Sequence, residues 1–183
     1  MTNSNERHRL SLIIATLGPS TDNEKELITM LMAGIARQWT DGVDIARVLH
    51  SDGEDIAKNR IDIFRSQSKK RNLSTQIYLD TDSENIDIEK YINFANTVGP
   101  DIATFPKSIG IENFSKIKDN LNSEIKISLR LKNSDSLDDL DSYYDHCAYV
   151  MIESSSQDIV DNKLVEGAKS KNVEPIYLAK MPT

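Results

Sequence analysis

Short apolar runs alternate with longer amphipathic segments along the whole chain, and this alternation restricts the fold more than any other feature of the sequence. Apolar runs of this length are typical of buried strands, whereas the longer segments place apolar side chains at helical spacing. Strands that alternate with helices through short connections pack as a mainly parallel sheet covered by helices. The predicted strands are residues 10–17, 44–49, 75–81, 100–105, 124–131, 148–154 and 174–181.

The amphipathic segments predict helices between these strands. Thr21 with Glu24, and Ser51 with Glu54, have the spacing of a capping box, in which the hydroxyl bonds a free amide of the first turn. The predicted helices are residues 24–32, 56–70, 87–98, 111–121, 137–145 and 158–172.

Periodicity leaves two architectures open, a doubly wound sheet and a (β/α) barrel. Neither the G-x-G-x-x-G pattern after the first strand nor a phosphate-binding loop pattern is present. The nucleotide-binding versions of these folds therefore lose support.

Length and charge narrow the class of protein further. With 183 residues and one cysteine, Cys147, the chain fits one domain without an internal disulfide or a cysteine-based metal site. The net charge of -7 argues against nucleic-acid binding, which needs a basic surface. No run reaches the roughly 20 apolar residues that span a bilayer, and the polar amino terminus lacks a signal-peptide pattern. We expect a cytoplasmic protein with a polar tail at residues 1–9 and a single domain at residues 10–183.

A series of segments between residues 9 and 181 resembles the barrel domain of pyruvate kinase, in the same order as in that family. These segments are IIATLGPSTDNEKEL, DIARVLHSDG, IYLDT, DIATF, ISLRLKN and VEGAKSKNVEPIYLAKM. The resemblance implies an α/β, TIM-barrel-like fold truncated to about seven βα units. It also implies that the lid and the carboxy-terminal regulatory domain of the family are absent. The open barrel edges would then favour a protein partner or a homo-oligomer.

The resemblance implies that several ligand-binding positions of the family are retained. Arg47 matches the phosphate-binding arginine, whose planar guanidinium suits a phosphate group. Ser51, Asp80 and Thr81 match ligands of a monovalent cation, but Leu49 replaces the asparagine that also holds this cation. Ser51 is explained equally well as the cap of the following helix.

The resemblance also implies that the catalytic positions have changed. Arg130 stands at the position of the lysine that neutralises the developing enolate, and Lys132 replaces the glutamate that binds the divalent metal. Lys180 stands at the position of the catalytic threonine, and the second metal ligand falls on or next to Ser155. Phosphoryl transfer depends on a metal with oxygen ligands. We therefore expect no metal and no cofactor, with the Mg and K sites of the family lost.

These changes predict a pseudoenzyme of the pyruvate kinase type that acts as an anion-binding or protein-interaction module. Basic side chains at the predicted strand ends of an acidic chain would form a pocket for a phosphoenolpyruvate-like anion. They are Arg47, Lys107, Arg130, Lys132 and Lys180. Two alternatives stay open. One is metal-independent lyase or aldolase chemistry on a phosphorylated or keto-acid ligand, with Lys132 or Lys180 as a Schiff-base amine. The other is a role as one chain of a split enzyme.

The segment after the third predicted strand has two interpretations. Asp80, Asp82 and Glu84 alternate as they would in a cation-binding loop, but Asn85 and Tyr91 stand where the calcium-loop pattern requires glycine and glutamate. We favour the second interpretation, a solvated loop that caps the third helix.

Overall fold

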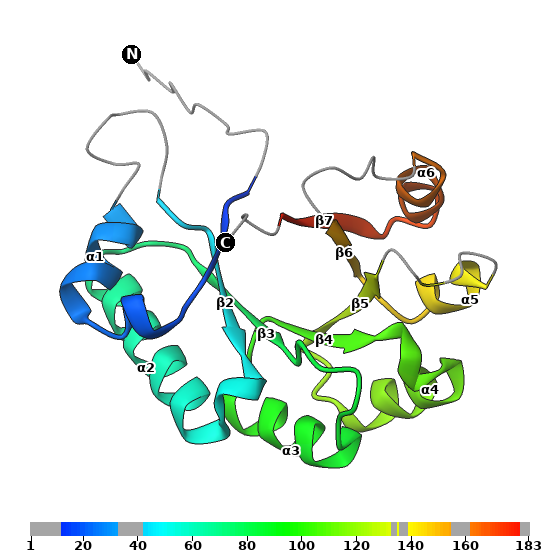
Figure 1. Cartoon of the computed structure of the whole chain (residues 1–183), viewed down its shortest axis with the longest axis horizontal. Helices are drawn as coiled ribbons and strands as arrows, with labels where there is room; N and C mark the ends of the chain where they lie inside the picture. Colours follow the sequence, from blue (N-terminus) through cyan, green and yellow to red (C-terminus); the bar gives the residue numbers. More distant parts are fainter. Residues whose placement is uncertain (1–11, 33–41, 133–134, 136–138, 155–161, 180–183) are drawn as a thin grey trace. The chain divides into compact units, whose positions relative to one another are not determined.

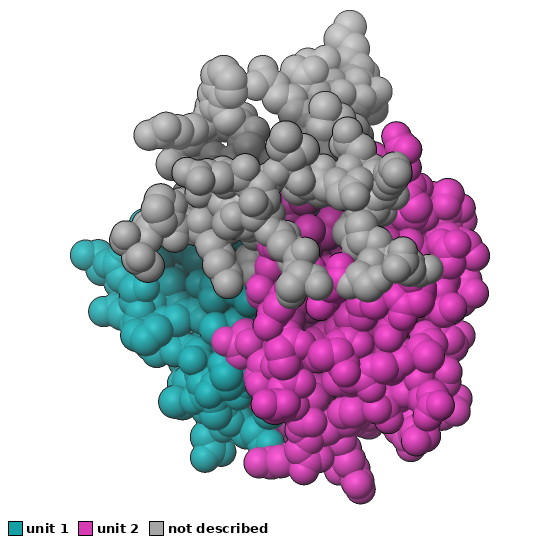
Figure 2. All heavy atoms as spheres, turned by 45° about the vertical axis from the view of Figure 1, so that its right-hand side comes forward, with its two compact units in different colours: residues 1–78 teal, residues 79–183 magenta. Residues whose placement is uncertain are grey.

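Helices and strands alternate along the chain in the computed structural model (Figure 1). The structure describes residues 12–32, 42–132, 135, 139–154 and 162–179. The chain forms two compact units, residues 1–78 and residues 79–183 (Figure 2). The boundary between them falls within the third strand, Gln76–Asp80. None of the described helices combines the length and the apolar character that crossing a membrane requires.

All seven predicted strands are confirmed, and they follow one another in the sheet in chain order. Strand pairs β1/β2, β4/β5, β5/β6 and β6/β7 are parallel. The mixed α/β class with a parallel sheet is therefore correct, as the alternation of elements predicts. The strands are β1 Ile14–Thr16, β2 Ile45–Leu49, β3 Gln76–Asp80, β4 Ile102–Pro106, β5 Lys126–Lys132, β6 Tyr149–Ser154 and β7 Glu174–Ala179.

A helix follows each of the first six strands, as predicted. Among the residues that the structure describes, short 3-10 turns precede three of these helices: η1 Pro19–Thr21, η3 His50–Asp52 and η4 Lys107–Ile109. The helices are α1 Glu24–Met32, α2 Glu54–Lys70, α3 Ile88–Val98, α4 Ile111–Asn120, α5 Leu140–Tyr144 and α6 Asn162–Ser170.

Both predicted capping boxes are wrong, because the chain makes a 3-10 turn before each helix. The Thr21 hydroxyl donates to Gly18 O at 2.9 Å within η1, and the first turn of α1 is capped by Asn23, whose Oδ1 accepts from Lys25 N at 2.8 Å. Ser51 lies in η3, and the N-cap of α2 is Gly53, which has no side-chain cap bond. A capping hydroxyl has to stand on the N-cap residue itself.

The connections after two of the strands have the same conformation. After β2 and after β4, a 3-10 turn ends in a glycine that is the N-cap of the following helix. Gly53 has φ 102° and ψ 144°, and Gly110 has φ 82° and ψ 154°. Residues other than glycine rarely adopt these backbone torsion angles. The glycines therefore set the direction in which α2 and α4 leave the strand ends.

In the first unit, the buried Arg60 forms ion pairs with two more exposed carboxylates, Asp22 after η1 and Asp52 in η3. Arg60, on α2, is 6% exposed, and its Nε and Nη2 lie 2.6 and 3.0 Å from the two carboxylate oxygens of Asp22. Its Nη1 pairs with Asp52. The hydrogen bonds raise the pKa of Arg60 and lower the pKa of Asp22. The cluster therefore anchors both the 50–53 segment and the Asp22 segment to α2.

The core of the second unit contains a continuous row of aromatic rings. Phe105, on β4, packs edge-on against Tyr91 of α3 and Phe114 of α4, with ring centroids 5.2 and 6.2 Å apart. Phe114 also packs edge-on against Tyr143 of α5, at 5.1 Å. Such pairs add to the stability that burial of the rings provides. This row holds three helices against one face of the sheet.

The opposite face of β4 and β5 is polar although it is buried. Thr104 is the register partner of Ser128, and Pro106 is the partner of Arg130. Because side chains alternate between the two faces of a strand, Thr104, Ser128 and Arg130 point away from the aromatic row. All three are buried. A buried polar face requires internal partners, and those of Arg130 are carboxylates at or beyond the carboxyl ends of β3 and β6.

Candidate functional site

Charged side chains of the second unit gather at the carboxyl ends of its strands. Asp80 is the last residue of β3, and Arg130 and Lys132 stand at the end of β5. The register pairs Lys132 of β5 with Glu153 of β6. Ligand sites of parallel α/β proteins lie at this end of the strands.

Arg130 is the buried cation of this cluster. It is 1% exposed, and the carboxylate of Asp80, which is 0% exposed, lies 3.7 Å from its Nη1. Glu153 Oε1 lies 4.0 Å from the same nitrogen, and Glu84 Oε1 lies 3.0 Å from Nη2. A buried guanidinium is stable only when carboxylates compensate its charge in this way. Arg130 is therefore the centre of the cluster.

Glu84 connects the two basic residues of β5. Its Oε1 is shared, since it lies 3.0 Å from Arg130 Nη2 and 2.8 Å from Lys132 Nζ, and its Oε2 accepts from the Ser108 hydroxyl. Burial raises the pKa of Glu84, but the bonds from Lys132 and Ser108 and the charge of Arg130 outweigh burial, so that the pKa is lowered. The charged form of Glu84 is thus the form that the cluster holds.

The segment that carries Glu84 makes two tight local turns. Asp80 Oδ1 accepts from Asp82 N at 3.1 Å, and Asp82 has φ 44°, a left-handed conformation that aspartate tolerates better than most residues. The Thr81 hydroxyl donates to Ser83 O at 3.3 Å. Asp87 Oδ1 then caps α3 by accepting from Lys90 N at 3.0 Å. These bonds place Glu84 over the end of β5.

The expected solvated loop is therefore only partly correct. Asp87 does cap the third helix, as that interpretation requires, but Glu84 is 34% exposed and engaged by three side chains. Sequence reasoning missed this role of Glu84. The sequence signal for this role was the position of Glu84, four residues after Asp80, in a chain that carries Arg130 and Lys132 at the end of another predicted strand.

The geometry is that of a carboxylate bound by a guanidinium, an ammonium and a hydroxyl. Hydrogen bonds between charged groups are short and strong, and a guanidinium can bind two oxygens of one oxyanion side by side. Arg130 uses only Nη2 for a hydrogen bond within the described residues, because its buried Nε and Nη1 have no hydrogen-bond partner there. Nη1 instead faces the carboxylates of Asp80 and Glu153, so Nη2 is the guanidinium nitrogen that bonds Glu84.

Three of the predicted site residues come together here: Asp80, Arg130 and Lys132. Thr81 is next to them in sequence and 1% exposed. Lys107, at the start of η4, instead pairs with Asp139 at 2.6 Å and lies over the Tyr143 ring. Hence each described basic residue of this unit that the sequence places in an anion pocket has a carboxylate partner.

Arg47 and Ser51 belong to the first unit. Arg47 is buried in β2 and its Nη1 donates to the Thr16 hydroxyl at 3.2 Å, whereas Ser51 is exposed in η3. Lys180 and Ser155 lie outside the described residues. Among the described residues, no group of three or more His, Cys, Asp and Glu side chains is arranged to hold a metal ion.

Comparison with known proteins gives no family for this chain, because neither the family models nor the curated proteins contain a match.

Proposed function

We propose that the chain is a pyruvate-kinase-like barrel protein that binds a small oxyanion at the end of β5 and does not catalyse metal-dependent phosphoryl transfer. The observation that carries this proposal is the single carboxylate oxygen of Glu84 that Arg130 and Lys132 share. In this proposal Glu84 occupies the site as an internal anion. An external carboxylate or phosphate binds by displacing it.

The exposure of the three side chains supports such an exchange. Glu84 and Lys132 are 34% and 40% exposed, whereas Arg130 is buried. The carboxylate can therefore turn toward solvent while the guanidinium stays in place. Asp80 and Glu153 remain close to Arg130 after Glu84 leaves, so the guanidinium is never without a counter-charge. The external anion then takes the place of the Glu84 carboxylate, so the site does not gain positive charge.

The same geometry opposes a divalent cation at this strand end. A cation bound by Asp80 or Glu153 would lie within a few ångströms of the Arg130 guanidinium, since both carboxylates are within 4.0 Å of it. Repulsion between two positive charges at about 4 Å is of the order of 4 kcal/mol per charge pair near a protein surface. The guanidinium of Arg130 thus supplies a permanent positive charge at the position where metal-dependent chemistry would require a bound metal ion.

Isothermal titration with oxalate in the presence of EDTA tests the proposal. We expect weak binding to the wild-type chain and tighter binding to the Glu84→Ala variant, because the internal competitor is gone. If the wild-type site is open in about a tenth of molecules, the dissociation constant falls about tenfold. Glu112→Ala, which removes an exposed glutamate of α4, is the matched control and should leave the affinity unchanged.

Two results would overturn the proposal. The first is equal oxalate affinity in the wild-type chain and the Glu84→Ala variant, since Glu84 would then not occupy the site. The second is oxalate binding that survives Lys132→Met in the Glu84→Ala background, because the anion would then be bound elsewhere.

A further inference from the structure

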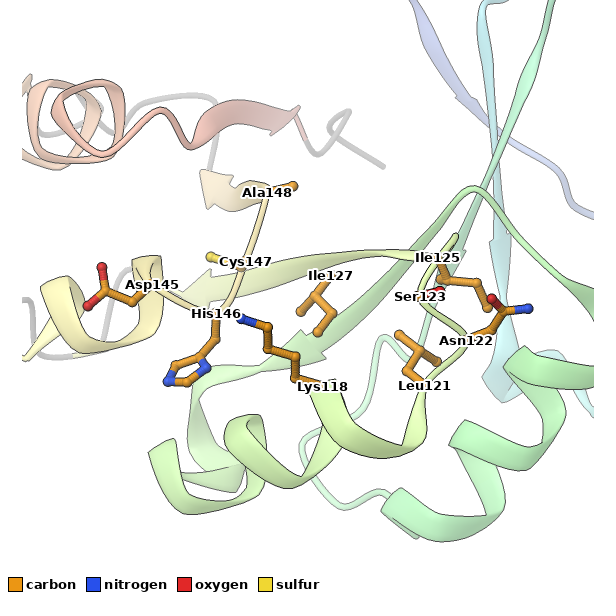
Figure 3. Close-up of a pocket in the computed structure, with 10 residues that line it drawn as sticks. All are labelled: Lys118, Leu121, Asn122, Ser123, Ile125, Ile127, Asp145, His146, Cys147 and Ala148. Atoms are coloured by element: carbon orange, nitrogen blue, oxygen red, sulfur yellow. The ribbon is translucent and has the colours of Figure 1, made fainter.

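A pocket lies at the other end of β5 from the Glu84 cluster, within the second unit (Figure 3). Its volume is about 400 Å³, within the range of small-molecule sites. The end of α4, the connection to β5, the first residues of β5 and the segment before β6 form its walls. Ile127 and Lys132 are five residues apart on β5, so this pocket and the Glu84 cluster are about 16 Å apart along the strand.

The inner wall of the pocket is apolar. Leu121, Ile125 and Ile127 line it and are otherwise buried in the core. Cys147 also lines it, and burial raises the pKa of its thiol to about 12. The thiol is therefore mostly protonated near neutral pH, adds apolar surface to the wall and reacts slowly with alkylating agents.

The charge at the rim of the pocket is positive. Lys118 extends from α4 toward the 145–148 segment in Figure 3, and within the described residues no carboxylate pairs with it. Asp145 is the acidic residue of the lining, and it pairs with Lys171 Nζ at 3.4 Å. The ammonium of Lys118 is thus the uncompensated charge of the lining, in a chain whose net charge is -7.

His146 lines this pocket and carries a buried ring nitrogen. Its Nδ1 is buried and has no hydrogen-bond partner within the described part of the chain. Buried polar atoms are nearly always bonded, and an exception calls for a bound molecule or an ordered water. The ring lines the same pocket as Lys118.

We infer that this pocket binds a small amphipathic anion, an organic carboxylate with an apolar body. The apolar body packs against Leu121, Ile127 and Cys147, and the carboxylate pairs with Lys118 at the rim. A neutral compound of the same shape lacks the second contact, and a cation is repelled by it. The inference does not depend on the Glu84 cluster.

Two-dimensional ¹H–¹⁵N NMR of the full chain, titrated with benzoate, tests the inference. We expect saturable shifts of the backbone amides of residues 118–127 and 145–148, with weaker binding of benzyl alcohol. Lys118→Gln should weaken benzoate binding about fivefold, the usual effect of one exposed charged contact. Lys116→Gln removes an exposed lysine of the same helix that does not line this pocket, and should leave the affinity unchanged.

Cys147 gives a second readout, because it is the single cysteine of the chain. Benzoate should slow its alkylation by N-ethylmaleimide in the wild-type chain, and should slow it less in the Lys118→Gln variant. Absence of saturable shifts at these amides would overturn the inference. So would equal benzoate affinity in the wild-type and Lys118→Gln chains, or unchanged alkylation of Cys147 at benzoate concentrations that saturate the shifts.

Discussion

The carboxylate of Glu84 lies 3.0 Å from the guanidinium of Arg130, an ion pair that joins the segment after β3 to the end of β5. Arg130 is almost fully buried, whereas Glu84 is one-third exposed. One partner is therefore a fixed part of the core, and the other can exchange with solvent. The proposed exchange of Glu84 with an external anion requires this difference in exposure.

Replacing Arg130 with methionine should destabilise the second unit severely. The substitution leaves the fully buried Asp80 without its cation, and breaking a buried pair in this way costs about 3–5 kcal/mol. Urea denaturation measures the loss in free energy of unfolding. Asp80→Asn in the Arg130→Met background should recover part of it, and a double variant as unstable as the sum of its single changes would show that the two residues do not interact.

Acid should weaken the folded state through Asp22 and Glu84. The pKa of each carboxyl is lowered in the folded state, so the unfolded chain binds more protons as the pH falls. Their contribution is complete above the unfolded pKa values, near 3.8 and 4.5, and is lost as the pH falls through the lower folded values. The pH dependence of the free energy of unfolding should therefore be shallower in Asp22→Asn and in Glu84→Gln below pH about 4.5. Unchanged slopes in both variants would contradict the ion pairs described here.

Gly53 should tolerate substitution worse than Gly18. A Cβ atom has open space at both positions, but Gly53 has φ 102° and Gly18 has φ -155°. Alanine at position 53 should cost about 1–3 kcal/mol from backbone strain alone, and alanine at position 18 should be close to neutral. Thermal unfolding of the two variants compares them, and equal melting temperatures would refute the positive φ at Gly53.

The order of the helices and strands could be predicted from the sequence because apolar periodicity is local. Runs such as residues 100–105 and 111–121 carry their own strand and helix signals, and β4 and α4 form there. The helix starts could not be predicted as well. Thr21 and Ser51 have the spacing of capping boxes in the sequence. The N-cap of α2 is nevertheless Gly53, whose φ of 102° is not visible in the sequence.

The basic half of the candidate site was predictable, since Arg130 and Lys132 stand at a strand end. Asp80 was also predicted as a site residue, but Glu84 was not, because its contact with Arg130 spans 46 residues and depends on the turns after Asp80. The pocket lined by Lys118 and Cys147 has no signal in the sequence. Its lining comes from four segments whose residues look like ordinary core and surface positions.

The aromatic row of the second unit should contribute strongly to its stability. Phe114 is fully buried and contacts the rings of both Phe105 and Tyr143. Phe114→Ala should therefore cost about 3–5 kcal/mol through lost burial and a residual cavity. Phe114→Leu should cost less in the same urea titration, and a loss below about 1 kcal/mol for the alanine variant would show that the ring is not in the core.

A Schiff-base role for Lys132 should be absent. Its Nζ contacts the Glu84 carboxylate at 2.8 Å, so a carbonyl compound has to displace this contact before it reaches the amine. Incubation with pyruvate and borohydride, followed by mass spectrometry, should leave Lys132 unmodified. A pyruvate adduct on Lys132 that is lost in Lys132→Met would support lyase or aldolase chemistry instead.

A crystal structure of the Glu84→Ala variant grown with oxalate and EDTA would show directly what occupies the site. We predict oxalate between Arg130 and Lys132, with an oxygen near the position that Glu84 Oε1 takes in the wild-type chain and no metal ion beside it. An empty site, or oxalate that appears only when Mg²⁺ replaces EDTA and is bound through that ion, would contradict a metal-free oxyanion site.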